Sequence, residues 1–237
     1  GGASMAAGSG GLGGLLTIET KPDWNKGRSL MISTGAGSFG KYSGLVKLRA
    51  GGKKMQSVTR LFANSEINDF PFMNQAGFSE PVRQYRNNAE VIQNSLMQEF
   101  YFRGKKSITT ASAWYNYLDR NLPSNILVPQ NDGAESQLDR SLRTVLNHNR
   151  YFGGGGTETT IAWFSEDLWY VNKTISVDSR NRSNTIFLRE VVEIPAGSKT
   201  DIKFMVLDEV NMVRSVNYDG QVTRNLLTMS VSARREI

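Results

Sequence analysis

The carboxyl-terminal third of the chain constrains the fold most, because apolar and polar residues alternate on both sides of Asp219-Gly220. Asp-Gly between two alternating runs favours a two-residue hairpin turn, since both central residues take positive φ. Such a turn pairs Tyr218 with Gln221 and puts every second residue on one face. That face is largely apolar: Val210, Met212, Val216, Tyr218, Leu227 and Met229. The segment therefore predicts a sheet with one side meant for a core.

Further strands are predicted at both ends of the chain. Runs rich in β-branched and aromatic residues indicate strands over 159–164, 168–177, 185–194 and 202–207 in the carboxyl-terminal block, and over 15–20, 29–33, 45–49 and 55–62 in the amino-terminal block. Gly51-Gly52 predicts a two-residue hairpin that places Arg49 opposite Lys54 and Lys47 opposite Gln56. The four glycines of 153–156 indicate a hinge or loop between the middle of the chain and the last strands.

The middle third predicts helices. Its apolar residues recur at spacings of three and four, as one stripe of an amphipathic helix requires: Val82, Tyr85, Ala89, Ile92, Leu96 and Phe100. Gly104 would end this helix. Two shorter helices are predicted over 110–121, before Pro123, and over 133–148, where Asp132 and Glu135 form a capping-box pattern.

These elements together predict an α+β fold. We expect a β-sandwich or barrel of about eight or nine mostly antiparallel strands, with a helical insertion near residues 79–148. Residues 1–14 contain seven glycines and no charge, which is typical of a flexible arm. Residues 15–237 would form a single domain, with strands over 15–78, the insertion over 79–150 and strands over 157–237. Two domains divided near Gly153 are the alternative.

Composition excludes several kinds of chemistry. The 237 residues include no cysteine and only one histidine, His148, which rules out disulfides, thiolate sites and multi-histidine metal sites. No apolar run approaches the ~20 residues of a membrane-spanning helix. The amino end lacks the pattern of a signal peptide. We therefore expect no metal, no cofactor and no membrane partner.

Positive charge is concentrated in the first third. The net charge is +6, and residues 1–78 hold nine Lys or Arg against four Asp or Glu. Six of these cations surround the Gly51-Gly52 hairpin and are the candidate contacts to nucleic acid or another polyanion: Lys41, Lys47, Arg49, Lys53, Lys54 and Arg60. A solvated strand edge, protected by lysine against aggregation, explains the same residues equally well.

A glycine-rich stretch gives a second candidate site. Gly35, Gly37 and Gly40 fit G-x-G-x-x-G, and Lys41 follows as in a phosphate-binding loop. Tyr42 stands where Ser or Thr would hold Mg²⁺, and a strand, where a helix is needed, is predicted to follow. Asp208, at the end of an apolar run, resembles the acidic residue of a second nucleotide motif. Turns and strand ends explain these residues better than nucleotide binding.

No catalytic set emerges, so the leading hypothesis is a non-enzymatic structural protein. We expect a self-assembling component of a virion or phage particle, a capsid or tail protein, acting through subunit–subunit packing. Its partners would be other copies of itself and other particle proteins, with nucleic acid as a further candidate, and its location a virion or other large assembly, otherwise the cytoplasm. A nucleic-acid-binding module using the basic hairpin 41–60 and a nucleotide-binding enzyme with a degenerate loop at 35–41 are the alternatives.

Overall fold

The computed structural model describes residues 22–25, 27–76, 78–123, 134–197, 199–216 and 219–235. These residues form twelve β-strands and no helix. The glycine-rich arm predicted over 1–14 and the strand predicted over 15–20 lie outside the described residues. No helix in these ranges is long and apolar enough to cross a membrane.

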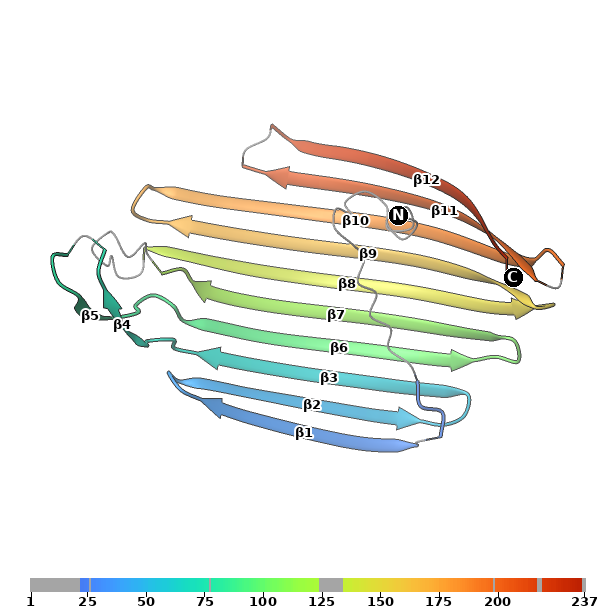
Figure 1. Ribbon diagram of the computed structural model, residues 1–237, viewed down its shortest axis with the longest axis horizontal. Coiled ribbons are helices and arrows are strands. Elements are labelled where there is room, and N and C mark those ends of the chain that lie inside the picture. Colours follow the sequence, from blue (N-terminus) through green and yellow to red (C-terminus); the bar gives the residue numbers. More distant parts are fainter. Residues whose placement is uncertain are drawn as a thin grey trace.

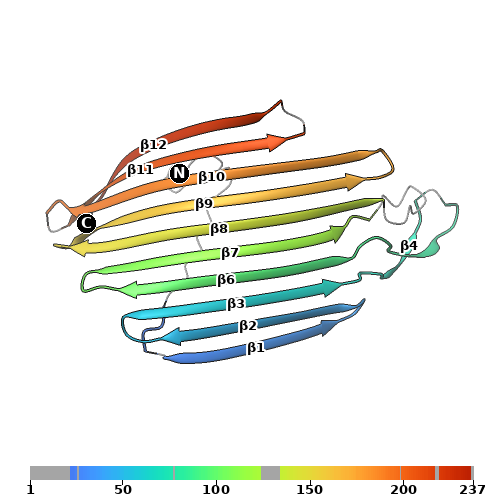
Figure 2. The same cartoon turned by 180° about the vertical axis from the view of Figure 1, so that it is seen from behind.

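Ten of the strands form one antiparallel sheet in which each strand pairs with its neighbours in the order β1-β2-β3-β6-β7-β8-β9-β10-β11-β12 (Figures 1 and 2). The strands become longer toward the middle of the chain. Their bounds are β1 Arg28–Gly37, β2 Lys41–Gly51, β3 Met55–Glu66, β6 Val91–Arg103, β7 Ser107–Asn121, β8 Glu135–Phe152, β9 Gly155–Asn172, β10 Val177–Pro195, β11 Thr200–Ser215 and β12 Gln221–Arg235. The remaining two, β4 Pro71–Asn74 and β5 Val82–Tyr85, form a separate hairpin beyond one end of the sheet (Figure 1).

The predicted α+β fold is therefore wrong, although the expected antiparallel strands are confirmed. The region predicted as a helical insertion over 79–148 supplies β5, β6, β7 and most of β8. It joins the two flanking strand blocks into one sheet. That sheet has ten strands, against the eight or nine expected, and its edges are β1 and β12.

The helix prediction failed because a spacing of four residues satisfies both periods. Ile92, Leu96 and Phe100 share one face of a helix, but residues four apart also share one face of a strand. The exposure of the residues between these positions distinguishes a helix from a strand. Along β6 the exposed and less exposed residues alternate for most of its length, as a strand requires. The threonines and tyrosines of β7 favour a strand as well.

The predicted hairpins form, but with longer loops. Arg214, not Tyr218, pairs with Gln221 at the start of β12. At the other hairpin Lys47 pairs with Arg60, where a two-residue loop predicted Gln56. Each register is displaced by four residues, and because four is even, the strand residues predicted to share a face still do so.

The glycines of 153–156 are a turn within the sheet and not a hinge between domains. Phe152 pairs with Gly155, which leaves Gly153 and Gly154 as a two-residue connection between β8 and β9. Both have positive φ, 48° and 88°. This is the conformation that joins two twisted antiparallel strands most directly.

The sheet's core lies on one face only. We call face A the side that carries Val46, Leu96 and Trp163, and face B the side that carries Arg60, Glu99 and Leu207; the strand registers assign every other residue to one or the other. The buried residues of the ten strands all lie on face B: Gln56, Val58, Glu99, Tyr101, Ala162, Asn172, Val191, Met205 and Leu207. Face A is where the large exposed apolar side chains gather.

Candidate functional site

Face A carries apolar side chains on all ten strands, with polar residues interspersed among them. Three consecutive cross-strand rows form its centre. The first runs through Ile32, Val46, Leu61, Leu96, Tyr115, Leu142, Ser165, Asn184, Met212 and Thr223; the second through Leu30, Leu48, Thr59, Gln98, Ala113, Thr144, Trp163, Ile186, Val210 and Asn225; the third through Arg28, Ala50, Ser57, Phe100, Ala111, Leu146, Ile161, Leu188, Asp208 and Leu227. We call these the apolar rows. Each strand contributes one residue to each row, so the antiparallel register places these residues side by side.

The apolar rows are exposed to a degree that is unusual for such residues. Leu30 and Ile32 are 63% exposed at one edge, Ile161 is 48% exposed in the middle and Leu227 is 59% exposed at the other edge. Arg28 and Asp208 are the charged residues of the three rows. Exposed apolar patches of this extent mark surfaces that contact another apolar body.

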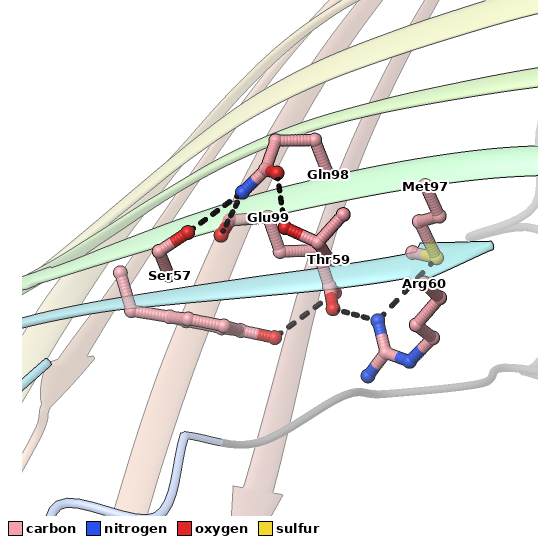
Figure 3. Close-up of polar contacts among 7 residues, drawn as sticks. Ser57, Thr59, Arg60, Met97, Gln98 and Glu99 are labelled. Atoms are coloured by element: carbon pink, nitrogen blue, oxygen red, sulfur yellow. Dashed lines mark hydrogen bonds and ion pairs between the residues drawn. The ribbon is translucent and has the colours of Figure 1, made fainter. Parts of the chain in front are cut away.

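Polar residues inside the apolar rows satisfy one another. The Thr59 hydroxyl donates to Oε1 of Gln98 at 2.6 Å, and Nε2 of Gln98 donates to the Ser57 hydroxyl at 2.9 Å (Figure 3). Thr144 donates to the backbone carbonyl of Trp163 at 3.3 Å. Polar groups that are already paired lose little when water is removed from them, whereas Oδ1 of Asp208 in the third row has no hydrogen-bond partner.

Face B is built differently, from charged and hydrogen-bonded side chains. Arg60 on β3 forms an ion pair with Glu99 on β6, whose carboxylate is only 1% exposed (Figure 3). The Tyr101 hydroxyl donates to Oε1 of Glu99 at 2.9 Å. A buried carboxylate is costly unless it is paired and hydrogen-bonded, and both conditions hold here.

The amino-terminal residues that precede β1 also contact face B. The backbone N–H of Asp23 donates to Oε1 of Gln56 at 3.1 Å, and Nε2 of Gln56 donates to the Asp23 carbonyl. The Arg103 guanidinium lies 5.7 Å from the ring centre of Trp24. Face B therefore contacts residues that precede β1, whereas face A presents exposed apolar side chains.

The predicted basic cluster is divided by the structure. Lys41, Lys47, Arg49 and Arg60 lie on face B, and Lys53 and Lys54 lie in the exposed connection between β2 and β3. Three of the six cations form ion pairs, since Lys41 binds Glu66 at 2.7 Å, Arg49 binds Asp23 at 3.4 Å and Arg60 binds Glu99.

Contacts with neighbouring side chains lower the pKa of Glu66. The hydrogen bond from Lys41, with further bonds from Asn64 and Asn68, holds the pKa of the Glu66 carboxyl below its ordinary value of 4.5. The cation of Lys41 is thus compensated within the chain, which leaves it less charge to offer a polyanion.

The glycine-rich stretch is a hairpin. Gly35 and Gly37 belong to β1, Gly37 pairs with Lys41, and β2 follows directly. Asp208 lies in β11, near the opposite edge of the sheet. No helix end is available here for a phosphate, so the geometry gives the nucleotide-binding alternative no support.

Metal-ligand clusters can be sought among the described residues of both faces. In the ranges that the structure describes, no three His, Asp or Glu residues are placed to hold a metal ion. The functional surface that the sequence reasoning missed is face A of β6, β7 and β8. Its signal was the position of Ile92, Leu96, Phe100 and Phe102 at even spacings, which the helical stripe concealed.

A scan against protein-family models finds no match, and neither does a search of curated proteins. Function is therefore inferred from the geometry of the two faces.

Proposed function

We propose that this chain is a structural protein whose face A lies against the hydrocarbon of a lipid bilayer. The observation that carries the proposal is the set of apolar rows, which cross ten strands while the buried core lies on the opposite face. An antiparallel sheet normally turns its apolar face to a protein core and its polar face to water. Here the buried residues lie on the more polar, ion-paired face B and face A is left exposed, so face A needs an apolar partner of its own.

On β2 and β6 the uncharged length of face A fits hydrocarbon, whereas on β10 the charged residues Arg182 and Glu190 of face A stand closer together. Face A is free of charge from Ile92 to Phe102 on β6 and from Tyr42 to Ala50 on β2. A tilted strand crosses the hydrocarbon core in about 9–11 residues, and both segments have this length. On β12 the apolar side chains of face A lie further along the register, from Leu227 to Val231, so the apolar surface runs obliquely to the strands.

Backbone hydrogen bonding also supports contact with lipid hydrocarbon. Each strand between the two edges pairs on both sides with neighbours in the sheet, so its peptide groups need no water. The edge strands β1 and β12 have one neighbour each. In hydrocarbon both would have to pair with further strands, since an open edge is excluded there.

The second candidate is the self-assembling particle protein expected from the sequence, with face A as the subunit–subunit contact. The observation in its favour is the same apolar surface. Ten strands about 4.8 Å apart, with three rows about 7 Å apart, would cover roughly 600–700 Å² on each copy, in the range of a standard interface. A capsid or tail location would follow from this candidate. The polyanion-binding alternative has less support, because three of its six cations are paired internally.

Folding into vesicles tests the first candidate against the second. The chain, unfolded in urea, is diluted into buffer with or without phosphatidylcholine vesicles. We expect it to float with the vesicles, to resist extraction at alkaline pH and to acquire β-structure only when lipid is present. A regular oligomer that stays soluble without lipid, seen by light scattering, would instead support the particle protein and contradict the first proposal.

A matched pair of variants controls for general destabilisation. Ile161→Arg places a charge in the middle of face A, and Thr160→Arg places one at the adjacent position on face B of β9. An arginine near the bilayer midplane costs about 2–4 kcal/mol. We expect Ile161→Arg to reduce flotation strongly and Thr160→Arg to reduce it much less; equal losses would argue against lipid contact through face A.

A further inference from the structure

Four arginines gather on face A at one margin of the apolar rows. Arg140, Arg182 and Arg214 occupy a single cross-strand row over β8, β10 and β11, with Asp167 between them on β9. This row lies directly beside the apolar row that contains Leu142 and Met212. Arg180 lies one position further from the apolar rows on β10. The side chains of all four arginines are exposed.

The carboxylate of Asp167 contacts two of these arginines. Arg180 binds Asp167 through two hydrogen bonds, from Nε to Oδ1 at 3.1 Å and from Nη2 to Oδ2 at 2.8 Å. Arg182 approaches the same Oδ2 at 3.8 Å. The hydrogen bond from Arg180 and the charges of Arg180, Arg182 and Arg140 hold the pKa of the Asp167 carboxyl below its ordinary value of 3.8. Asp167 thus stays ionised and offsets one of the four positive charges.

The other acids of this region are already engaged. Glu166 and Asp139 lie on face B, where Arg143 binds Glu166 at 2.6 Å and Arg120 binds Asp139 at 3.4 Å. On face A, Asp178 accepts a hydrogen bond from Nε1 of Trp169 at 2.7 Å, and Asp119, in the same cross-strand row as Arg180, accepts one from the Tyr117 hydroxyl at 3.3 Å. Four arginines thus face the three carboxylates of Asp119, Asp167 and Asp178, which leaves one positive charge in excess beside the apolar rows.

We propose that this arginine row binds the phosphate groups of anionic lipid headgroups. The inference rests on the proposed contact of face A with a bilayer and names the lipid chemistry that it selects. A guanidinium matches a phosphate with two parallel hydrogen bonds. Arg140 to Arg214 spans three strand spacings, about 14 Å, so the row offers several such forks.

Two aromatic side chains fit the same position at the membrane surface. Trp169 is the cross-strand partner of Arg180, and Tyr117 lies 5.9 Å from the Arg140 guanidinium. Tryptophan and tyrosine concentrate where hydrocarbon meets headgroups. A lipid bound here would place its phosphate on the arginines and its acyl chains on the adjoining apolar rows, so it would bind more tightly than a free phosphate.

Lipid titration of the folded chain in detergent tests the inference. Short-chain phosphatidylglycerol, phosphatidylcholine of the same chain length and inorganic phosphate are the three probes, and native mass spectrometry counts the bound molecules. We expect phosphatidylglycerol to bind at least about tenfold more tightly than either other probe, with affinity that falls as salt is added. Equal binding of the two lipids, or inorganic phosphate binding as tightly as phosphatidylglycerol, would overturn the inference.

Two sets of variants test whether the arginine row causes the preference for phosphatidylglycerol. Replacing Arg140, Arg182 and Arg214 by Gln should remove the preference for phosphatidylglycerol, a loss of roughly tenfold or more. Replacing Arg83, Arg224 and Arg234 by Gln makes the same change in net charge outside the row and should keep the preference. Asp167→Asn, which removes the carboxylate between the arginines of the row, should strengthen binding. Equal losses in the two triple variants would contradict the inference.

Failure of this inference and failure of the proposed function give different results. Flotation with pure phosphatidylcholine vesicles tests the proposed function and needs no anionic lipid. A chain that floats normally but binds the two lipids equally would overturn the arginine assignment alone. A chain that stays soluble without lipid and does not float would overturn the proposed function, and with it the membrane setting of the arginines.

Discussion

Lys41 and Glu66 form an ion pair whose effect can be measured directly. The pKa of Glu66 is lowered in the folded chain, so the pair stabilises the fold above the ordinary value of 4.5, and this stabilisation is lost as pH falls through the lowered pKa. Lys41→Ala should raise the pKa of Glu66 toward 4.5. Because Lys41 is half exposed, the loss of stability at neutral pH should be below about 1 kcal/mol.

Titration of the Glu66 carboxyl carbon by NMR measures this change. Lys54→Ala is the matched control, since Lys54 lies in the exposed β2–β3 connection. It should leave the pKa of Glu66 where it is. A pKa of Glu66 that is the same in Lys41→Ala and in the unaltered chain would show that Asn64 and Asn68 are sufficient to lower it.

Asp208 is a residue at which substitution should stabilise the protein. It lies in the third apolar row between Leu188 and Leu227, and its Oδ1 is buried without a hydrogen-bond partner. An unsatisfied buried polar atom costs about 1–3 kcal/mol. Asp208→Leu should therefore raise the free energy of unfolding by about this amount, measured by urea titration in detergent or vesicles.

Glu209, the next residue, is the control for Asp208. It lies on face B and accepts a hydrogen bond from Asn211 at 2.6 Å. Glu209→Leu removes a satisfied acid, so it should leave stability unchanged or lower it. If both leucine substitutions stabilise the protein equally, the benefit comes from added apolar area in general and not from the unpaired oxygen of Asp208.

At the scale of elements, the sequence predicted turns better than it predicted the type of the segments between them. The glycine pairs at 51–52 and 153–154, and Asp219-Gly220, all lie at hairpin connections of the sheet. The helices failed because Leu138 and Leu142 are four residues apart, a spacing that fits both helix and strand. The lengths of the loops were not predicted correctly, because a loop length depends on tertiary pairing that a turn dipeptide such as Asp219-Gly220 does not determine.

The β2–β3 hairpin provides a sharp test of one such connection. Gly51 has φ of 146°, and a Cβ there would overlap the Met55 carbonyl oxygen and come within 2.6 Å of the Gln56 Cα. Gly52 has no atom within 4 Å of an added Cβ. Gly51→Ala should destabilise the protein by more than about 1 kcal/mol, and Gly52→Ala should have little effect. Equal unfolding free energies for the two variants would contradict this hairpin geometry.

At the scale of the whole molecule, what the sequence could predict was antiparallel strands with one apolar side. It could not show that the apolar sides of ten strands join into one surface, because this depends on the register between segments such as β3 and β6 that β4 and β5 separate along the chain. The predicted basic cluster also depends on contacts between segments that the sequence alone does not predict. Four of the six predicted cations lie on face B, but the acidic partners of three of them, Asp23, Glu66 and Glu99, come from other segments.

The two edges of the sheet give the last prediction. β1 and β12 each pair on one side, so alternate backbone N–H groups along them point away from the sheet. In detergent, we expect these amides to exchange with deuterium far faster than the amides of β7, β8 and β9, which are paired on both sides. In vesicles the edges must be paired to be tolerated in hydrocarbon, so β1 and β12 should become protected. Fast exchange of both edges in vesicles, with the central strands still protected, would show that the edges remain open to water and would contradict the placement of the whole sheet in the bilayer.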